Sequence, residues 1–185
     1  MVERILHKNH ERKLMNAVRP GDAVLAYTSG AYGRLIQFGQ AIRWRRHSKW
    51  HHAALVVEVD PSGQVWCIQM ARRCELVKLE DIAPGRPLKI IPCPKGVDRK
   101  KSVDYANKIV GTDYGILTIV SIAITILTPG AFRIDFRHEG TLICSAAVAR
   151  SWEHGGWDCP VDPFSITPAQ IDELLGDTGW PYDGA

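Results

Sequence analysis

The stretch HAALVVEV at residues 52–59 constrains the fold more than any other part of the chain. It is a continuous apolar run rich in β-branched residues, and the turn sequence DPSG closes it at 60–63. These features predict a strand with residues 64–70 as its hairpin partner. Further short strands are predicted at 75–78 and 88–91. Neighbouring antiparallel strands of this kind would form a small sheet or half-barrel.

The segments around these strands predict helices, a further short strand at 23–27 and a Gly/Pro-containing loop at 81–87. Hydrophobic spacing and end signals place helices at residues 11–18, 34–44, 103–110, 141–153 and 168–175. We expect the helix at 141–153 to be capped near Thr141 and the last one to open at Pro168. No linker divides the chain, so the sequence predicts one α+β domain over residues 1–185, with a core of about 18–157 and a helical tail at 158–185.

The composition limits the function classes. The apolar share of 45% and the charged share of 23% are typical of globular proteins. The net charge of +3 is too small to indicate nucleic-acid binding, and we interpret the basic run at 43–49 as a solvated loop. The five cysteines have no regular spacing, which indicates neither a disulfide framework nor a zinc site. We therefore expect reduced thiols and no metal or organic cofactor.

The N-terminus and one apolar segment bear on localisation. The first fifteen residues, MVERILHKNHERKLM, lack the apolar stretch of a signal peptide, so we expect a cytoplasmic protein. Gly115–Leu127 is apolar apart from Ser and Thr, but it is shorter than the about 20 residues that span a membrane. A buried core helix is the favoured interpretation. Peripheral membrane contact through this segment is the alternative.

Cys144 is the candidate nucleophile. It stands in TLICSAAVARSWEHGG, close to the predicted start of a helix. A thiol at a helix N-terminus is favoured as thiolate by the exposed N–H groups and the helix dipole. Burial as a packing residue is the alternative, since cysteine is among the most often buried residues.

His52 is the candidate base, because it opens the strongest predicted strand. Its side chain is expected to share a face with Ala54 and Val56, whose small size would let the cysteine helix lie across that face. The imidazole would take the thiol proton and later protonate the leaving group. His51 is the competing assignment and points to the other face.

Gln69 is the candidate third member of the site. Its amide, on the neighbouring predicted strand, could hydrogen-bond the far nitrogen of the imidazole and hold its tautomer. An exposed strand residue is the alternative. The backbone N–H groups at the start of the Cys144 helix are a better oxyanion site than the hydroxyls of Tyr27 and Tyr114. For the other polar residues a surface or loop role is favoured, as for His138, His154, Asp22 and Asp113.

Three blocks of the chain together resemble the circularly permuted NlpC/P60 group of papain-like proteins. They are RPGDAVLAYTSG with the following LIQFGQAI, then KWHHAALVVEV, then TLICSAAVARSWEHGGW. By position His52 matches the family histidine and Cys144 the nucleophile, and the order His before Cys is the permutation. Gln69 falls at the third polar site, where the family often has an acid or a His.

The resemblance implies a papain-like α+β fold and a cysteine hydrolase without metal or organic cofactor. Its expected reaction is attack of the Cys144 thiolate on an amide or ester carbonyl, through an acyl-thioester. Substrates in the wider group include peptides, peptidoglycan-type peptides and lipid acyl groups. A non-catalytic binding module on the same fold and an acyltransferase at a lipid surface are the alternatives.

Overall fold

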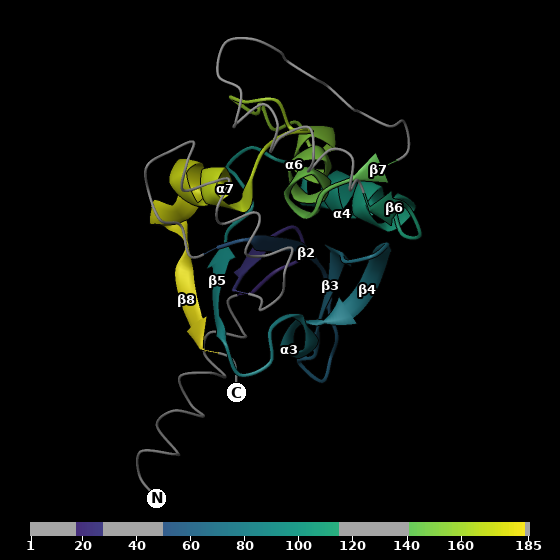
Figure 1. Cartoon of the computed structure of the whole chain (residues 1–185), viewed down its shortest axis with the longest axis vertical. Helices are drawn as coiled ribbons and strands as arrows, with labels where there is room; N and C mark the ends of the chain where they lie inside the picture. The colour runs from purple at the N-terminus through teal and green to yellow at the C-terminus, as the bar shows by residue number, and fades with distance from the viewer. Residues whose placement is uncertain (1–17, 28–49, 115–140, 184–185) are drawn as a thin grey trace, which may run out of the picture.

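The computed structural model describes residues 18–27, 50–114 and 141–183. Their main feature is a six-stranded sheet in the order β4-β3-β2-β1-β5-β8, with every neighbouring pair antiparallel (Figure 1). Its strands are β1 (Ala23–Ala26), β2 (His52–Val59), β3 (Val65–Met70), β4 (Cys74–Lys78), β5 (Pro87–Ile91) and β8 (Trp180–Asp183). The expected α+β class with a small antiparallel sheet is thereby confirmed for the described part of the chain.

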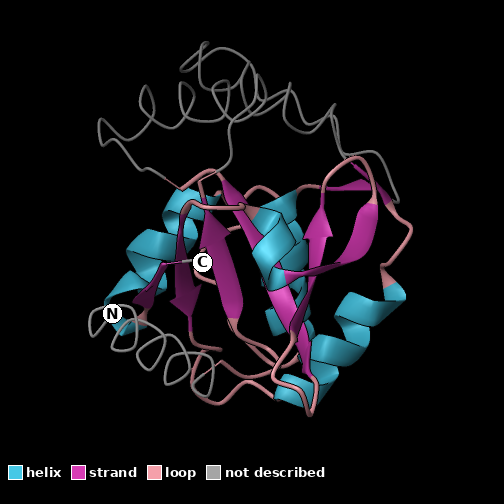
Figure 2. Ribbon diagram, turned by 90° about the horizontal axis from the view of Figure 1, so that it is seen from below, coloured by secondary structure: helices cyan, strands magenta, loops and turns pink. Residues whose placement is uncertain are grey.

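Four helices accompany the sheet in the described residues. They are α3 (Leu79–Ile82), α4 (Arg99–Lys108), α6 (Cys144–His154) and α7 (Pro168–Leu175), with a short 3-10 turn at Gly176–Thr178. Two short parallel strands, β6 (Asp113–Tyr114) and β7 (Thr141–Leu142), form a second small sheet. Figure 2 shows strands in the middle of the described structure and helices on either side. None of these helices is both long and apolar enough to cross a membrane.

The strands β2, β3 and β4 form a meander whose register positions the side chains discussed below. Ala54 of β2 lies opposite Gln69 of β3, which in turn lies opposite Glu75 of β4. The bounds of β2 are those predicted, and the DPSG turn is held by Asp60, whose carboxylate accepts the backbone N–H groups of Ser62 and Gln64. Local sequence signals are sufficient here because the strand is β-branched and the turn follows at once.

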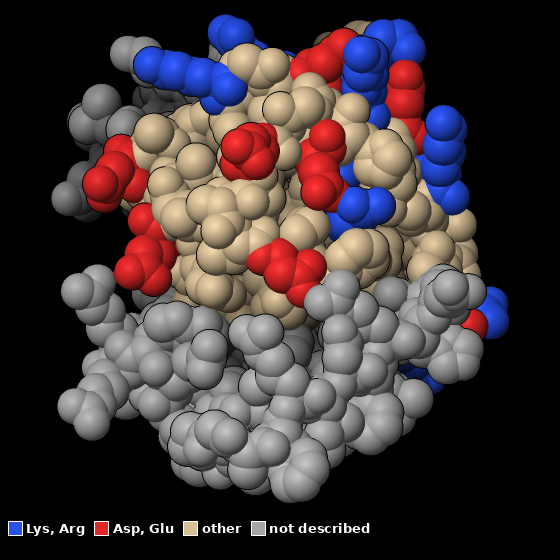
Figure 3. All heavy atoms as spheres, turned by 90° about the horizontal axis from the view of Figure 1, so that it is seen from above, with Lys and Arg blue, Asp and Glu red and all other residues tan. Residues whose placement is uncertain are grey.

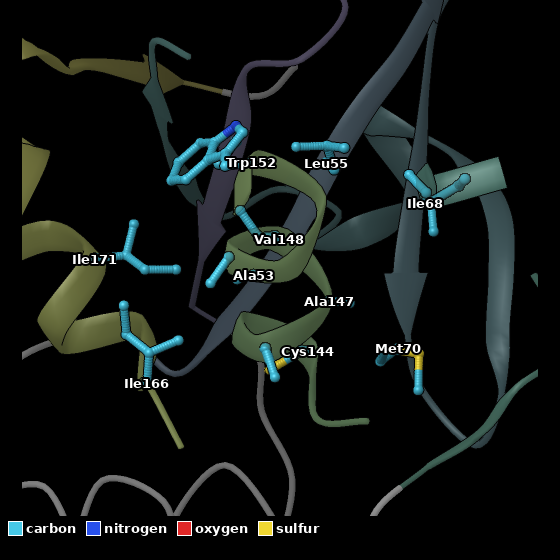
Figure 4. Packing of buried hydrophobic residues seen from close by; sticks show 14 of the residues in the cluster. Ala53, Leu55, Ile68, Met70, Cys144, Ala147, Val148, Trp152, Ile166 and Ile171 are labelled. Atoms are coloured by element: carbon cyan, nitrogen blue, oxygen red, sulfur yellow. The ribbon is translucent and has the colours of Figure 1, made fainter. Parts of the chain in front are cut away.

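Helix α6 packs on the face of β2 that carries Ala53 and Leu55, as Figure 4 shows. The expectation that it would cover Ala54 and Val56 is wrong, because these two residues belong to the core on the opposite side of the sheet, under α3. His52 still reaches the helix because it is the first residue of β2 and Cys144 is the first residue of α6.

Four other predictions need correction. The helix at 141–153 begins at Cys144, not near Thr141, because Thr141–Leu142 pairs with β6 instead. The predicted loop at 81–87 begins inside α3, which buries Leu79 and Ile82. The tail at 158–185 is not only helical, since β8 completes the sheet. Asp22 is buried: its carboxylate accepts the N–H groups of Arg19 and Cys93 and pairs with Arg99.

Other sequence interpretations lie outside the described residues. These are residues 11–17 of the helix predicted at 11–18, the helix at 34–44, the basic run at 43–49, the apolar segment at 115–127 and the side chain of His138. Val18, the described residue of the first predicted helix, is not helical. On the described part of the face seen in Figure 3, acidic and basic side chains are interspersed, and most of the Lys and Arg side chains lie toward its upper and right edges.

Candidate active site

The thiol of Cys144 lies at the N-terminus of α6. Its helix has no side-chain cap at Ile143, so the first backbone N–H groups are left for other acceptors. The sulfur receives hydrogen bonds from the backbone N–H groups of Ser145 and Ala53. Cys144 is only 3% exposed, so the sulfur lies among protein groups more than in water. These donors favour a negative charge on sulfur at this position.

The imidazole of His52 lies between the thiol and Gln69. One side of the ring interacts with Cys144 through a side-chain hydrogen bond. On the other side, Nε2 lies 2.8 Å from Oε1 of Gln69. Since Nε2 is engaged by the amide, Nδ1 is the ring nitrogen that remains for the thiol. The structure thus brings together the three residues that the sequence singled out.

The pKa of Cys144 and the pKa of His52 each shift in the direction that favours the charged form of that group. Burial raises the pKa of Cys144, but the hydrogen bond and charge of His52 outweigh it, with help from the two backbone N–H groups, and the pKa of the thiol is lowered. Burial lowers the pKa of His52, but the hydrogen bond and charge of Cys144 outweigh it, and the pKa of the imidazole is raised. Each group of the pair therefore stabilises the charged form of the other, thiolate with imidazolium, relative to the isolated side chains.

The other four cysteines shift the opposite way. Burial raises the pKa of Cys74 and of Cys93 to about 11 each. It also raises the pKa of Cys67, which is fully buried, and that of the more exposed Cys159. All five thiols are free. Cys144 is accordingly the one cysteine of this chain whose surroundings favour the thiolate.

Gln69 is itself held by a residue that sequence analysis did not single out. Its Nε2 donates a hydrogen bond of 3.0 Å to Oε1 of Glu75, directly across from it on β4. Burial lowers the pKa of His52, and the contacts with Cys144 and Gln69 raise it. The charge of Glu75 makes a further, smaller contribution to the rise. Glu75 stands in no recognisable motif, and only the pairing of β3 with β4 shows that it lies beside Gln69.

The alternative base and the alternative oxyanion groups have other surroundings. His51 is buried with its ring centroid 4.9 Å from that of Tyr27, and its pKa is lowered by burial first and by the charges of His52 and Arg86. Tyr27 also lies under the guanidinium of Arg86, at 5.6 Å. These contacts indicate a packing role for both rings. The side chain of Tyr114 lies outside the described residues.

In residues 18–27, 50–114 and 141–183, no cluster of three or more His, Cys, Asp or Glu side chains is arranged to hold a metal ion. Comparison of the chain with protein-family models finds no match. Comparison with curated proteins finds none either. What the described structure defines is a mixed α+β protein with a thiol–imidazole–amide constellation at the end of its sheet.

Proposed function

We propose that this protein is a cysteine-dependent hydrolase that cleaves an amide bond through an acyl-thioester. The observation that carries the proposal is the contact of Cys144 with His52, which lowers the pKa of the thiol while Gln69 holds the far side of the ring. A nucleophile, a base within reach and a group that orients the base are the parts that covalent catalysis requires.

The first half of the reaction forms the thioester. The Cys144 thiolate attacks the carbonyl carbon, a C–S bond forms, and the carbonyl π electrons move to oxygen. N–H groups at the start of α6, which has no side-chain cap, would stabilise that oxyanion. As the C–O double bond re-forms, the C–N bond breaks, and the imidazolium of His52 protonates the departing amine.

The second half releases the acid. Neutral His52 takes a proton from water, whose oxygen attacks the thioester carbonyl. The C–S bond then breaks and the thiolate leaves, with imidazolium beside it again. One water is consumed, and the products are a carboxylic acid and an amine. The chain returns to its starting charge state, so no further reactant enters the cycle.

The fold proposed for this chemistry is papain-like in the circularly permuted NlpC/P60 arrangement. Three features support it: a cysteine at the start of a helix, a histidine at the start of the sheet's second strand, and a polar residue on the third. The histidine precedes the cysteine in the chain, as the permutation requires. The proposed substrate class is a peptide or peptidoglycan-type amide.

The proposal is tested by the reactivity of Cys144 toward iodoacetamide, read residue by residue by mass spectrometry. Native Cys144 should react faster at pH 7 than each of the other four thiols. His52→Ala should slow it by about tenfold or more, since one pKa unit is a factor of ten in thiolate. Pro87→Ala, a change on an exposed residue of β5, is the control for substitution alone.

Selective and His52-dependent alkylation would justify screening peptide and peptidoglycan-type amides for turnover. The contrary outcome is a native Cys144 that reacts no faster than Cys74 or Cys93. In that case the enzyme proposal fails, and a non-catalytic binding module is the better description of the chain.

A further inference from the structure

Glu75 determines which end of the Gln69 amide faces the imidazole. A carboxylate at neutral pH only accepts hydrogen bonds, so the NH₂ end of the amide must point to Glu75. The carbonyl end then points to His52, at 2.8 Å from Nε2. The reversed amide would place its oxygen against the carboxylate, two acceptors without a proton between them. Glu75 therefore excludes one of the two amide orientations.

The orientation of the amide in turn determines the tautomer of His52. The Oε1 atom of Gln69 only accepts, so Nε2 of the ring must carry the proton. In the neutral ring this leaves the lone pair on Nδ1, on the side of Cys144. A reversed amide would offer N–H groups to Nε2 and favour the proton on Nδ1, where the ring could not accept the thiol proton.

Glu75 also places a negative charge near the ring. Burial lowers the pKa of His52. Contacts with Cys144 and Gln69 raise this pKa, and the Glu75 carboxylate raises it further. Its position is fixed by the sheet, because Gln69 and Glu75 are directly opposed on β3 and β4. A neutral amide alone orients a base but stabilises the imidazolium less than a carboxylate does.

We propose that Glu75 is a positioning residue of this site, and that Glu75 and Gln69 together replace the single carboxylate that would otherwise hold the imidazole. The amide supplies the contact, and the carboxylate supplies the direction of that contact and the charge. The proposal rests on the proposed function, because it assigns Glu75 to the Cys144–His52 pair.

The test compares Glu75→Gln with Glu58→Gln. Both changes remove one exposed carboxylate from the same sheet without changing side-chain size, but Glu58 is near the far end of β2 from His52. Two readouts are measured for each variant in the full chain: the iodoacetamide rate of Cys144 between pH 6 and 8, and the NMR titration of the His52 ring.

For Glu75→Gln we expect the alkylation rate of Cys144 between pH 6 and 8 to fall about threefold to tenfold, and the His52 titration to move to lower pH. Because Glu75 is exposed, the loss should shrink when salt is raised to about 0.5 M. Glu58→Gln should reproduce the native values. Circular dichroism of both variants checks that the fold is kept.

The exchanged pair, Gln69→Glu with Glu75→Gln, is the rescue. Here the carboxylate accepts directly from Nε2 of His52, and the new amide at position 75 donates to it. The Cys144 rate and the His52 titration should return to native values or beyond. A merely structural role of Glu75 predicts no rescue, since neither side chain regains its original partner.

Two results would overturn the proposal, and they are distinct. If native Cys144 is selectively reactive but Glu75→Gln behaves like Glu58→Gln in both readouts, the proposed hydrolase stands and the role of Glu75 is refuted. If native Cys144 has no advantage over the other thiols, the proposed function itself fails, and the assignment of Glu75 fails with it.

Discussion

The indole Nε1 of Trp152 donates a hydrogen bond of 2.7 Å to the backbone carbonyl of Gly21. The bond joins the last turn of α6 to the turn that precedes β1. Trp152 is fully buried, and its ring packs edge-on against Trp157, with 5.3 Å between centroids. The helix that carries the thiol is thereby fixed to the sheet at the end opposite Cys144.

Trp152→Phe should lower the free energy of unfolding by about 2 kcal/mol, because the carbonyl of Gly21 loses its partner inside the core. Urea unfolding followed by circular dichroism measures the change. Trp157→Phe is the matched control and should lose less, since Trp157 is half-buried. Equal losses in the two variants would show that the hydrogen bond to Gly21 is not the cause.

Asp22→Asn should cost about 3 kcal/mol of unfolding free energy. The buried carboxylate accepts two backbone N–H groups and the guanidinium of Arg99, and an amide can satisfy only part of this set. Asp113→Asn is the control, since Asp113 forms an exposed ion pair with Arg73 worth about 0 to 1 kcal/mol. Thermal melts of both proteins decide the matter, and a stable Asp22→Asn would contradict the role given to this network.

Gly155→Ala should cost about 3 kcal/mol for lack of space. A Cβ atom at Gly155 would lie 2.3 Å from Oγ of Ser102 and 2.7 Å from the backbone oxygen of Asp98, where α4 meets the end of α6. Gly63→Ala is the comparison: its φ of +87° is unfavourable, but nothing lies within 4 Å, and we expect about 1 kcal/mol. Chemical unfolding gives both values. The space argument is wrong if Gly63→Ala proves the more damaging.

Substitution of the two adjacent histidines should have different effects on the alkylation rate of Cys144. His51→Phe keeps an aromatic ring beside Tyr27 and should leave the Cys144 alkylation rate at pH 7 within about twofold. His52→Phe removes the base and should slow the reaction by about tenfold or more. Should His51→Phe abolish the reactivity while His52→Phe keeps it, the assignment of the base is reversed.

The pH dependence of alkylation follows from the direction of the pKa shifts. The pKa of Cys144 is lowered, so its thiolate persists as the pH falls and is lost only below that depressed value. Cys74 and Cys93, with pKa values of about 11, are thiolate in only about one molecule in ten thousand at pH 7. The ratio of Cys144 to Cys93 labelling should therefore rise as the pH is lowered from 9 to 7. A constant ratio would contradict the lowered pKa.

Sequence patterns predicted those elements whose signals are local. The β-branched run of β2 has in the structure the bounds that were predicted, and the last helix opens at Pro168 as predicted. The structure adds the capping box that Thr167 forms with Gln170. Elements that depend on distant pairing were missed. β8 contains Pro181 and forms only because β5 lies beside it. Thr141 belongs to β7 because it pairs with Asp113 of β6.

The candidate site shows the same division. Cys144, His52 and Gln69 were selected by residue type and position, and the structure brings them together. The face of β2 that α6 covers was predicted wrongly, because alternation along a strand does not say which side a helix will take. Glu75 could be recognised only from the register of β4 against β3.

Because His52 and Cys144 lie far apart along the chain, we expect the labelling rate of Cys144 to report the folded state. The pair exists only when β2 and α6 are docked, so unfolding should turn Cys144 into an ordinary cysteine and slow its labelling. The same event uncovers Cys67, Cys74 and Cys93, whose labelling accelerates. As denaturant is added, labelling of Cys144 would therefore decrease while labelling of those three cysteines increases. Both changes can be read in the same mass spectrum, and the denaturant concentration at which they occur would mark the unfolding transition without any added dye.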